Sequence, residues 1–418
     1  MNYSNRNLTK LMDLKFNKDY YRFLEENADA DINALRLTSS KKCFDFDFET
    51  AITQIECRRK NKIKLKDFVS NTDFFFPDPV SSEQSSHQGV ARFHASLIQD
   101  SQTVLDMTSG LGIDALTIAD YAKDVTAIDL DIKRVNALIH NSLTLGKTNI
   151  KVIQGDSIEI LQNSDCIFDV IFIDPSRRDQ NNKRLYNLSD CSPDVLNYQN
   201  LLFSKSKRVL IKASPLLDIS QTIKDFEKIE KIFVIGVKGE CKEILIVLNS
   251  EAGYVENKTV SLEAVDLNND GNIISSFQSF YPSPDIENKN IRKITYALIS
   301  DLQPDSFILE PSAMIMKIAP WQEICERFDA KKLGVSSHLF VTNQYPENFP
   351  GRVTRFKKII QKQDKKHLSG SRFSVISRNH PLSSEEIRKS FKLKEGDKNF
   401  IYATRLGDKP LMFITESL

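Results

Sequence analysis

Short apolar runs rich in β-branched residues follow one another along the middle of the chain and dominate its folding pattern. The runs are TVLDM (103–107), DVTAIDL (124–130), IKVIQG (150–155), DVIFID (169–174), RVLIKA (208–213), KIFVIGV (231–237) and EILIVLN (243–249). Amphipathic helical stretches such as GIDALTIADYA separate the early runs. This alternation predicts an α/β fold with a mostly parallel, doubly wound sheet. Only KGECK (238–242) separates the last two runs, which predicts a closing antiparallel hairpin.

The first of these runs leads into a glycine turn, VLDMTSGLGIDA (104–115). Gly110, Gly112 and Ala115 satisfy the spacing of a dinucleotide-binding loop, so a nicotinamide oxidoreductase is one hypothesis. Asp106 stands four residues before the first glycine and would repel a pyrophosphate. We therefore favour S-adenosylmethionine (SAM), which has no phosphate and carries an ammonium and a sulfonium. The glycines are expected to let the backbone approach this ligand closely.

Further acids follow the next strands in order. Asp129 ends the second run, where a carboxylate accepts hydrogen bonds from ribose hydroxyls, and Asp156 follows the third, within reach of an adenine amino group. All of these acids are expected in one crevice at the carboxyl ends of the strands. Each one could instead be an ordinary turn or cap aspartate.

The fourth run ends in DVIFIDPSRRD (169–179), where Pro175 restricts Asp174 to an extended conformation. DMTSGLG, AIDLD, QGDS and FIDPS resemble the ordered motifs of class I SAM-dependent methyltransferases. The fourth resembles the Asp-Pro-Pro-Tyr type, although Ser176 replaces the second proline and Arg177 the aromatic residue. The resemblance implies a Rossmann-like sheet with SAM as cofactor, bound by residues that include Thr108 and Asp174. The full set of SAM-binding residues that the resemblance implies is Asp106, Thr108, Gly110, Gly112, Asp129, Asp156 and Asp174.

Longer stretches, among them EQSSHQGVARFHASL, LIKASPLLDI, LEPSAMIMK, FPGR and RNHPLSSEEIRKSFK, resemble a bacterial methyltransferase family. That family has a ferredoxin-like insert and a C-terminal THUMP-like domain. The resemblance implies an RNA partner, such as tRNA or rRNA. We expect a helical N-terminal domain (1–85), a methyltransferase domain (86–270), a small ferredoxin-like α+β domain (275–325) and a basic THUMP-like domain (330–418). Ser383 and Glu386 predict a capping box for a helix in the last domain.

Three residues are candidates for the chemistry. Asp174 would accept hydrogen bonds from an amine target, and Arg177, with Arg178, would hold the nucleic-acid backbone. Lys212 is expected to reach the crevice from the end of the fifth strand. With Asp174 and Glu240 or Glu243 it resembles the Lys-Asp-Lys-Glu set of ribose 2′-O methyltransferases, in which a lysine of lowered pKa acts as base.

The second lysine of that set is not evident, because His94 occupies the plausible upstream position. Lys212 as a plain ion-pair partner remains an alternative. Residues 84–86 (QSS) are expected to cap the following helix rather than to cover the pocket.

Charge is unevenly distributed over the 418 residues. Residues 351–410 contain 16 Lys and Arg against 6 Asp and Glu, a net charge of +10 in a chain whose total is +1. A basic module on an acidic body is typical of nucleic-acid binding. The leading hypothesis is therefore a SAM-dependent RNA methyltransferase. The alternatives are methyl transfer to protein or a small molecule, and a non-catalytic RNA-binding scaffold that retains SAM.

The sequence also predicts a cytoplasmic protein without a metal site or a membrane segment. Its six cysteines are scattered without a C-x-x-C pair, which indicates reduced thiols, and its apolar runs are too short to span a bilayer.

Overall fold

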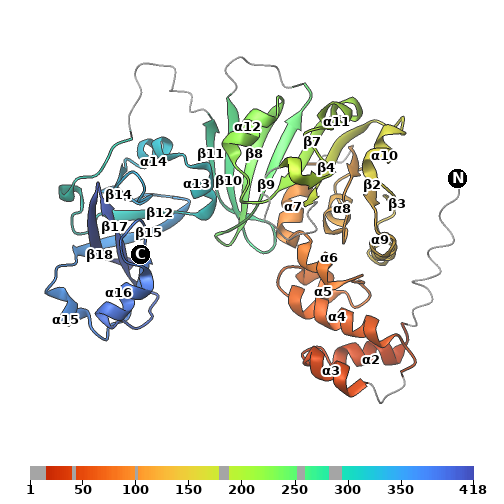
Figure 1. The fold of residues 1–418 in the computed structure, drawn as a ribbon, viewed down its shortest axis with the longest axis horizontal. Helices are drawn as coiled ribbons and strands as arrows, with labels where there is room; N and C mark the ends of the chain where they lie inside the picture. Colours follow the sequence, from red (N-terminus) through yellow and green to blue (C-terminus); the bar gives the residue numbers. More distant parts are fainter. Residues whose placement is uncertain (1–15, 40–43, 99–101, 178–187, 252–258, 282–293) are drawn as a thin grey trace. The chain divides into compact units, whose positions relative to one another are not determined.

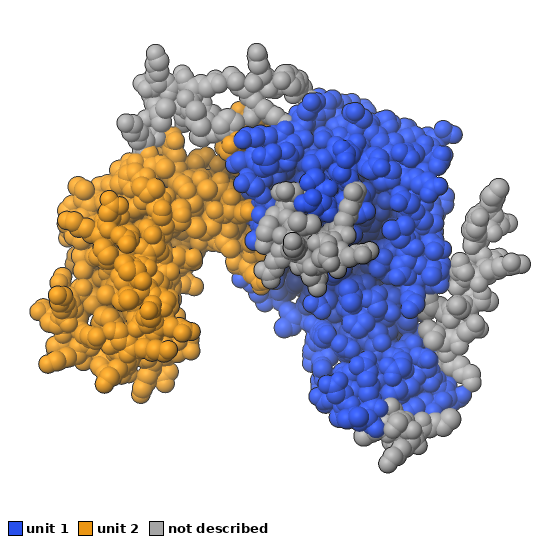
Figure 2. Space-filling view, in the orientation of Figure 1, with its two compact units in different colours: residues 1–238, 242–254, 267–274 blue, residues 239–241, 255–266, 275–418 orange. Residues whose placement is uncertain are grey.

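The computed structural model describes residues 16–39, 44–98, 102–177, 188–251, 259–281 and 294–418. Contacts divide the chain into two compact units, coloured separately in Figure 2. Unit 1 comprises residues 1–238, 242–254 and 267–274, and unit 2 comprises residues 239–241, 255–266 and 275–418. None of the helices in the described ranges is long and apolar enough to cross a membrane.

The first part of unit 1 is helical, as the sequence predicts. Its helices are α2 (Lys18–Glu26), α3 (Ile32–Ser39), α4 (Phe48–Asn61), α5 (Lys66–Ser70) and α6 (Pro79–Gln84). Asp47 caps α4 by accepting a hydrogen bond from the Thr50 amide. The Arg58 guanidinium donates to the carbonyls of Val69, Asn71, Thr72 and Phe74 and so fixes the turn after α5.

A nine-stranded sheet follows, with the order β11-β10-β8-β9-β7-β4-β1-β2-β3 (Figure 1). The strands are β1 (Thr103–Asp106), β2 (Asp124–Asp129), β3 (Ile150–Gln154), β4 (Phe168–Ile173), β7 (Ser206–Ala213), β8 (Ile229–Val237), β9 (Glu240–Asn249), β10 (Val260–Leu267) and β11 (Ile273–Tyr281). Strands β3, β2, β1, β4 and β7 are parallel, and β9 runs antiparallel to β7. The turn between β8 and β9 uses Lys238 and Gly239, which both have positive φ.

The connecting helices are α7 (Gln88–Ser96), α8 (Ile113–Ile118), α9 (Ile132–Thr144), α10 (Ser157–Gln162), α11 (Gln199–Lys205) and α12 (Ile219–Asp225). The central strands are buried on both faces, as the apolar residues Val170, Ile171 and Ile211 show. The predicted doubly wound α/β sheet is thus confirmed. Because β1 to β4 are parallel, the loops after them lie at one edge of the sheet.

Unit 2 contains a seven-stranded sheet with the order β13-β14-β12-β15-β18-β17-β16. Its strands are β12 (Phe307–Pro311), β13 (Lys331–Lys332), β14 (Phe340–Thr342), β15 (Gly351–Ile359), β16 (Ser374–Ser377), β17 (Asn399–Leu406) and β18 (Lys409–Ser417). Its helices are α13 (Ala313–Ile318), α14 (Trp321–Arg327), α15 (Asp364–Leu368) and α16 (Ser384–Phe391). The predicted capping box is confirmed, because Ser383 and Glu386 cap α16 reciprocally.

Alternation along the strands of unit 2 places one apolar cluster on each face of the sheet. Phe356, Tyr402 and Phe413 belong to one cluster, and Ile401 and Ile414 belong to the other. The sheet is therefore covered on both faces.

Candidate active site

Four of the predicted acids lie at the carboxyl edge of the large sheet. Asp106 and Asp129 end β1 and β2, Asp156 follows β3, and Asp174 directly follows β4. The parallel register pairs Asp106 with Ala127 and Asp129 with Gln154. The four strands are neighbours in the order β4-β1-β2-β3, so the acids share one edge rather than separate surfaces.

Hydrogen bonds join the loop after β1 to the strands on both sides. The Asp174 amide donates to Thr108 Oγ1 at 2.7 Å, and the Gly110 amide donates to Asp129 Oδ2 at 2.9 Å. The Ser109 amide donates to the Ile128 carbonyl at 2.9 Å. The glycine loop, the end of β2 and the end of β4 thus form one rigid rim.

Asp106 is a buried acid in an unfavourable electrostatic environment. Its side chain accepts a hydrogen bond from the Thr108 amide at 3.0 Å, and the residue is 1% exposed. Burial, together with the neighbouring carboxylates of Asp114, Asp174 and Asp129, raises the pKa of Asp106 well above its usual range. A ligand that brings positive charge to this position would stabilise the ionised form of Asp106.

Asp129 and Asp156 have structural partners within the chain. Asp129 accepts from Gly110 and Asp131 amides and forms an ion pair with Arg134 at 2.8 Å. Asp156 caps α10 through Oδ1, which accepts from the Ile158 and Glu159 amides. A carboxylate offers about four acceptor positions, so capping and ligand binding are compatible at Asp156.

The two glycines of the loop have different roles. Both have positive φ, +54° at Gly110 and +88° at Gly112. Apart from the adjoining residues, the nearest described atom to a Cβ on Gly110 would be Thr108 O at 4.0 Å, so the space beside it is open to a ligand. A Cβ on Gly112 would lie 2.3 Å from Leu138 Cδ1 of α9. The open space beside Gly110 is compatible with close approach of a ligand, whereas packing against α9 explains Gly112.

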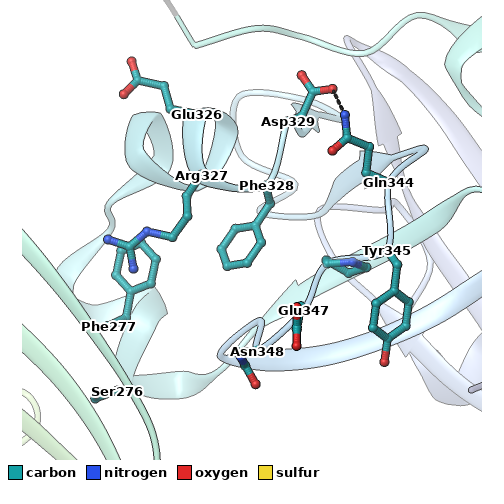
Figure 3. A pocket seen from close by; sticks show the side chains of 11 residues that line it. Ser276, Phe277, Glu326, Arg327, Phe328, Asp329, Gln344, Tyr345, Glu347 and Asn348 are labelled. Carbon is teal, nitrogen blue, oxygen red and sulfur yellow. Dashed lines mark hydrogen bonds between the residues drawn. The ribbon is translucent and has the colours of Figure 1, made fainter.

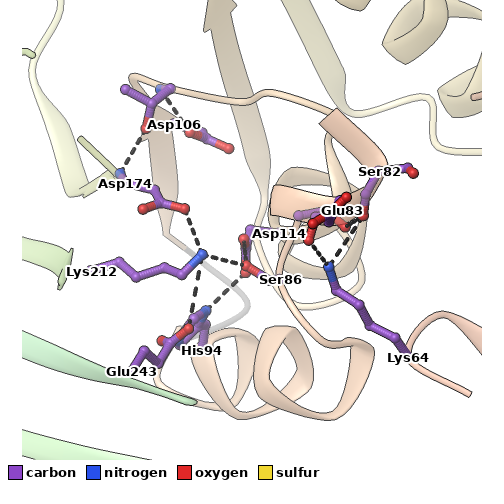
Figure 4. A network of polar contacts seen from close by, with 12 residues as sticks. Lys64, Ser82, Glu83, Ser86, His94, Asp106, Asp114, Asp174, Lys212 and Glu243 are labelled. Atoms are coloured by element: carbon purple, nitrogen blue, oxygen red, sulfur yellow. Dashed lines mark hydrogen bonds and ion pairs between the residues drawn. The ribbon is translucent and has the colours of Figure 1, made fainter. Parts of the chain in front are cut away.

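A closed ring of polar contacts lies next to this rim (Figure 4). Lys212 Nζ contacts Asp174 Oδ2 at 2.5 Å, Ser86 Oγ at 3.0 Å and Glu243 Oε2 at 3.9 Å. Ser86 donates to Asp114, and the His94 ring joins Asp114 at 2.8 Å to Glu243 at 2.6 Å. Asp174 is the most open member, because its side chain is 37% exposed and that of Lys212 only 12%.

The carboxylates of the ring keep its two bases charged. Burial alone would lower the pKa of Lys212, but Asp174, Glu243 and Asp114 raise it above its ordinary value. Burial also opposes the charge of His94, yet Glu243 and Asp114 raise its pKa to about 9. An imidazolium donates from both ring nitrogens and matches the two carboxylates. Lys212 therefore lacks the lowered pKa that the ribose-hydroxyl hypothesis requires.

Two details of the ring differ from the sequence interpretation. Ser86 does not cap α7, because His87 is the N-cap and accepts from the Gly89 amide. Ser86 is 4% exposed and bonds Asp114 and Lys212 instead. Of the two glutamates considered, Glu243 is the one that approaches Lys212.

Lys64 is a neighbouring residue that sequence reasoning missed. Its ammonium donates to the carbonyls of Ser82 at 3.2 Å and Glu83 at 2.6 Å, in the segment that leads to Ser86 (Figure 4). Burial, with the charges of Lys212 and Lys242, lowers the pKa of Lys64 to about 8. No motif spacing links residue 64 to residue 212, since only the fold brings them together.

Of the two arginines in the sequence hypothesis, the structure describes the strand position of one. Arg177 is in the short strand β5 (Ser176–Arg177), which pairs with β6 (Cys191–Ser192). Arg178 lies outside the described residues. Within the described ranges, no three His, Cys, Asp or Glu side chains are arranged to hold a metal ion.

Unit 2 has a separate pocket of about 470 Å³ between β11, α14 and the loop after β14 (Figure 3). The guanidinium of Arg327 lies over the Phe277 ring at 4.1 Å. Glu326, Asp329 and Glu347 also line the pocket, so acids outnumber the single arginine. This balance disfavours a phosphate ligand there.

The strand order with a reversed β9, the glycine turn and the acids after successive strands define the fold of a class I methyltransferase. Residues 101–251 match a family model described as an RNA cap guanine-N2 methyltransferase. Residues 307–350 match a ferredoxin-like domain, and residues 351–417 match a THUMP-like domain. The chain thus has the domain architecture of the methyltransferase family inferred from its sequence, with ferredoxin-like and THUMP-like domains at the C-terminal end.

Individual proteins resemble this chain in fold or in sequence. A crystal structure of a presumed methyltransferase from Porphyromonas gingivalis W83 has a TM-score of 0.80 and 24% identity, covering 96% of this chain and 97% of that one. An uncharacterized RNA methyltransferase of Mycoplasma mobile is 27% identical over 148 residues, 34% of this chain and 40% of that protein. An uncharacterized protein of Acanthamoeba polyphaga mimivirus is 29% identical over 148 residues, 32% and 57% of the two chains. The chain therefore matches less than two thirds of the length of these two relatives.

Proposed function

We propose that this protein is a SAM-dependent methyltransferase that methylates an amine nitrogen of a structured RNA, such as tRNA or rRNA, in the cytoplasm. One observation carries the proposal. Asp174 directly follows β4, is 37% exposed, and is held at 2.5 Å by the buried Lys212 beside the glycine loop. The match of residues 101–251 to an RNA methyltransferase family and the basic C-terminal segment support the choice of RNA.

The residues of the rim fit SAM. Asp106 supplies a buried carboxylate for a cationic group, Gly110 leaves open space for the ligand, and Asp129 and Asp156 supply acceptors for hydroxyl and amino groups. Thr108 holds the loop against the amide of Asp174. When bound, SAM supplies a methyl group already activated by its sulfonium.

The chain then has to position the nucleophile and accept a proton. The Asp174 carboxylate can accept hydrogen bonds from the N–H groups of an amine. These bonds would direct the lone pair of the amine nitrogen toward the methyl group. Lys212, Ser86 and the His94-centred contacts fix that carboxylate in one orientation. An amine is favoured over a ribose hydroxyl because a hydroxyl needs a base, and the pKa of Lys212 is raised rather than lowered. Lys212 thus acts as a positioning residue.

The test is transfer of tritiated methyl groups from SAM to total RNA from cells that lack the gene. Wild-type protein is expected to label RNA, and mass spectrometry of the digested nucleosides would identify a methylated base. Asp174→Asn keeps the size of the side chain and is expected to reduce the initial rate of labelling by about 10² or more. Absence of label in RNA, with label in protein or small molecules of an RNA-depleted extract from the same cells, would contradict the RNA assignment, and label in ribose would contradict the amine assignment.

A further inference from the structure

The ferredoxin-like and THUMP-like segments of unit 2 form one continuous sheet. Strand β12 comes from the segment 307–350, strand β15 from the segment 351–417, and the two strands pair antiparallel. Glu310 is directly opposite Arg352, and Pro311 is opposite Gly351. A Cβ on Gly351 would lie 2.2 Å from the Glu310 carbonyl oxygen, so the strands can approach this closely only with glycine there.

A buried glutamate at this seam holds two arginines. The Glu310 side chain is 10% exposed and accepts from Arg352 Nη1 at 3.1 Å and Arg378 Nη2 at 3.0 Å. The hydroxyl of Tyr402 donates to the same carboxylate at 3.0 Å. Arg352 also lies over the Phe400 ring at 5.0 Å. These contacts hold both guanidiniums in defined positions.

The backbone near Arg378 is fixed as well. The Arg378 amide donates to the Ala403 carbonyl at 2.8 Å. The Arg405 side chain donates to the Asn379 carbonyl at 3.1 Å. Asn379 itself has a φ of +57°, which places a sharp turn directly after Arg378. The backbone that carries the second arginine is therefore held in place.

The cluster has a net charge of +1 and an open side. The side chains of Arg352 and Arg378 are 49% and 48% exposed, although their shared partner is buried. A guanidinium has five N–H donors, so the bonds to Glu310 leave donors for an acceptor outside the protein. Paired, fixed guanidiniums match the oxygens of a phosphate. The surrounding segment 351–410 has a net charge of +10, which favours a polyanion.

We propose that Arg352 and Arg378, supported by Glu310 and Tyr402, form a binding site for a phosphate group of the substrate RNA. This inference rests on the proposed function for the identity of the polyanion. It assigns one defined phosphate contact to the seam of the two segments, in addition to the general attraction of the basic surface.

The test is filter binding of the full chain to total small RNA from cells lacking the gene, over a series of salt concentrations. Arg352→Gln and Arg378→Gln are each expected to weaken binding about tenfold and to reduce the salt dependence by about one phosphate contact. Arg355→Gln is the matched control. Arg355 is three positions along the same strand, which places it on the opposite face, and it pairs with Asp305 at 3.6 Å. Its loss removes the same charge and should change binding less than threefold.

A purely structural salt bridge predicts a different pattern. In that case Arg352→Gln would lower the stability of unit 2 without a specific loss of RNA binding. The fluorescence of the single tryptophan, Trp321, reports the stability of this unit. Arg352→Lys keeps the charge but loses the planar fork, so an intermediate loss supports the proposal even if Arg352→Gln is unstable. Equal binding by wild type, Arg352→Gln, Arg352→Lys and Arg355→Gln would overturn it, as would the absence of RNA binding by wild type.

Phosphatase treatment of the RNA distinguishes the source of the phosphate. If phosphatase treatment removes the difference in RNA affinity between Arg352→Gln and wild type, the bound group is a terminal phosphate. If the difference in affinity remains, the bound group is an internal phosphodiester. Methyl transfer is measured separately, so selective loss of binding with no transfer to RNA would refute the proposed function and leave the phosphate site supported.

Discussion

Replacement of His94 by glutamine tests the charged ring beneath Asp174. The imidazole is fully buried between Asp114 and Glu243, which raise its pKa from an ordinary 6.5 to about 9. Each unit of this shift corresponds to about 1.4 kcal/mol of folding free energy, so the protonated imidazole contributes about 3 kcal/mol. Because the folded pKa is the higher one, this contribution is complete below pH 6.5 and is lost as the pH rises toward 9 and beyond.

The assay is urea unfolding at several pH values between 6 and 10. Far-UV circular dichroism follows the whole chain, and Trp321 fluorescence follows unit 2, which serves as the internal reference. The wild-type unfolding free energy of unit 1 should fall by about 3 kcal/mol between pH 6.5 and 9. His94→Gln should be destabilised by a similar amount at pH 6.5 and should lack this pH dependence. Parallel curves for the two proteins would refute the charged-imidazole argument.

Other consequences are open to direct measurement. Asp174→Asn should reduce the rate of methyl transfer by about 10² to 10⁴ while SAM still binds, which single-turnover kinetics and calorimetry would separate. Gly110→Ala and Gly112→Ala should both lower the melting temperature because both positions have positive φ, and Gly112→Ala should lower it further because its Cβ also meets Leu138; Gly110→Ala should in addition weaken SAM binding, and unchanged SAM binding by Gly110→Ala would contradict the role assigned to this glycine. Raising the salt from 50 to 200 mM should weaken RNA binding by roughly 10³ if six phosphates are contacted, and an affinity indifferent to salt would remove RNA as the partner.

The sequence predicts the positions that follow directly from strand ends. Asp106, Asp129 and Asp174 could be assigned because each closes an apolar run, and parallel strands bring such ends to one edge. The capping box at Ser383 is equally local, since its partner is three residues away. Local rules are enough for these features.

The family resemblance grouped Lys212 with Asp174 and Glu243, but other contacts between distant segments were not predicted. His94 and Glu243 are 149 residues apart, and Glu310 and Arg378 are 68 residues apart. Nothing in the spacing of such residues indicates that they meet. Ser86 was expected to cap a helix because serine often does so. His87 is the N-cap instead, and Ser86 accepts a hydrogen bond from Lys212. The positive charge of Lys212 depends on three carboxylates that only the tertiary structure assembles.

Calorimetric titration of the protein with SAM, compared with NAD⁺, tests most directly whether the acid-lined rim is built for a cation. Wild-type protein should bind SAM and not NAD⁺, and Asp106→Asn, which removes the carboxyl group with little change in shape, should bind SAM at least tenfold more weakly. Failure of the wild type to bind SAM, or equal affinity of Asp106→Asn for it, would contradict the account.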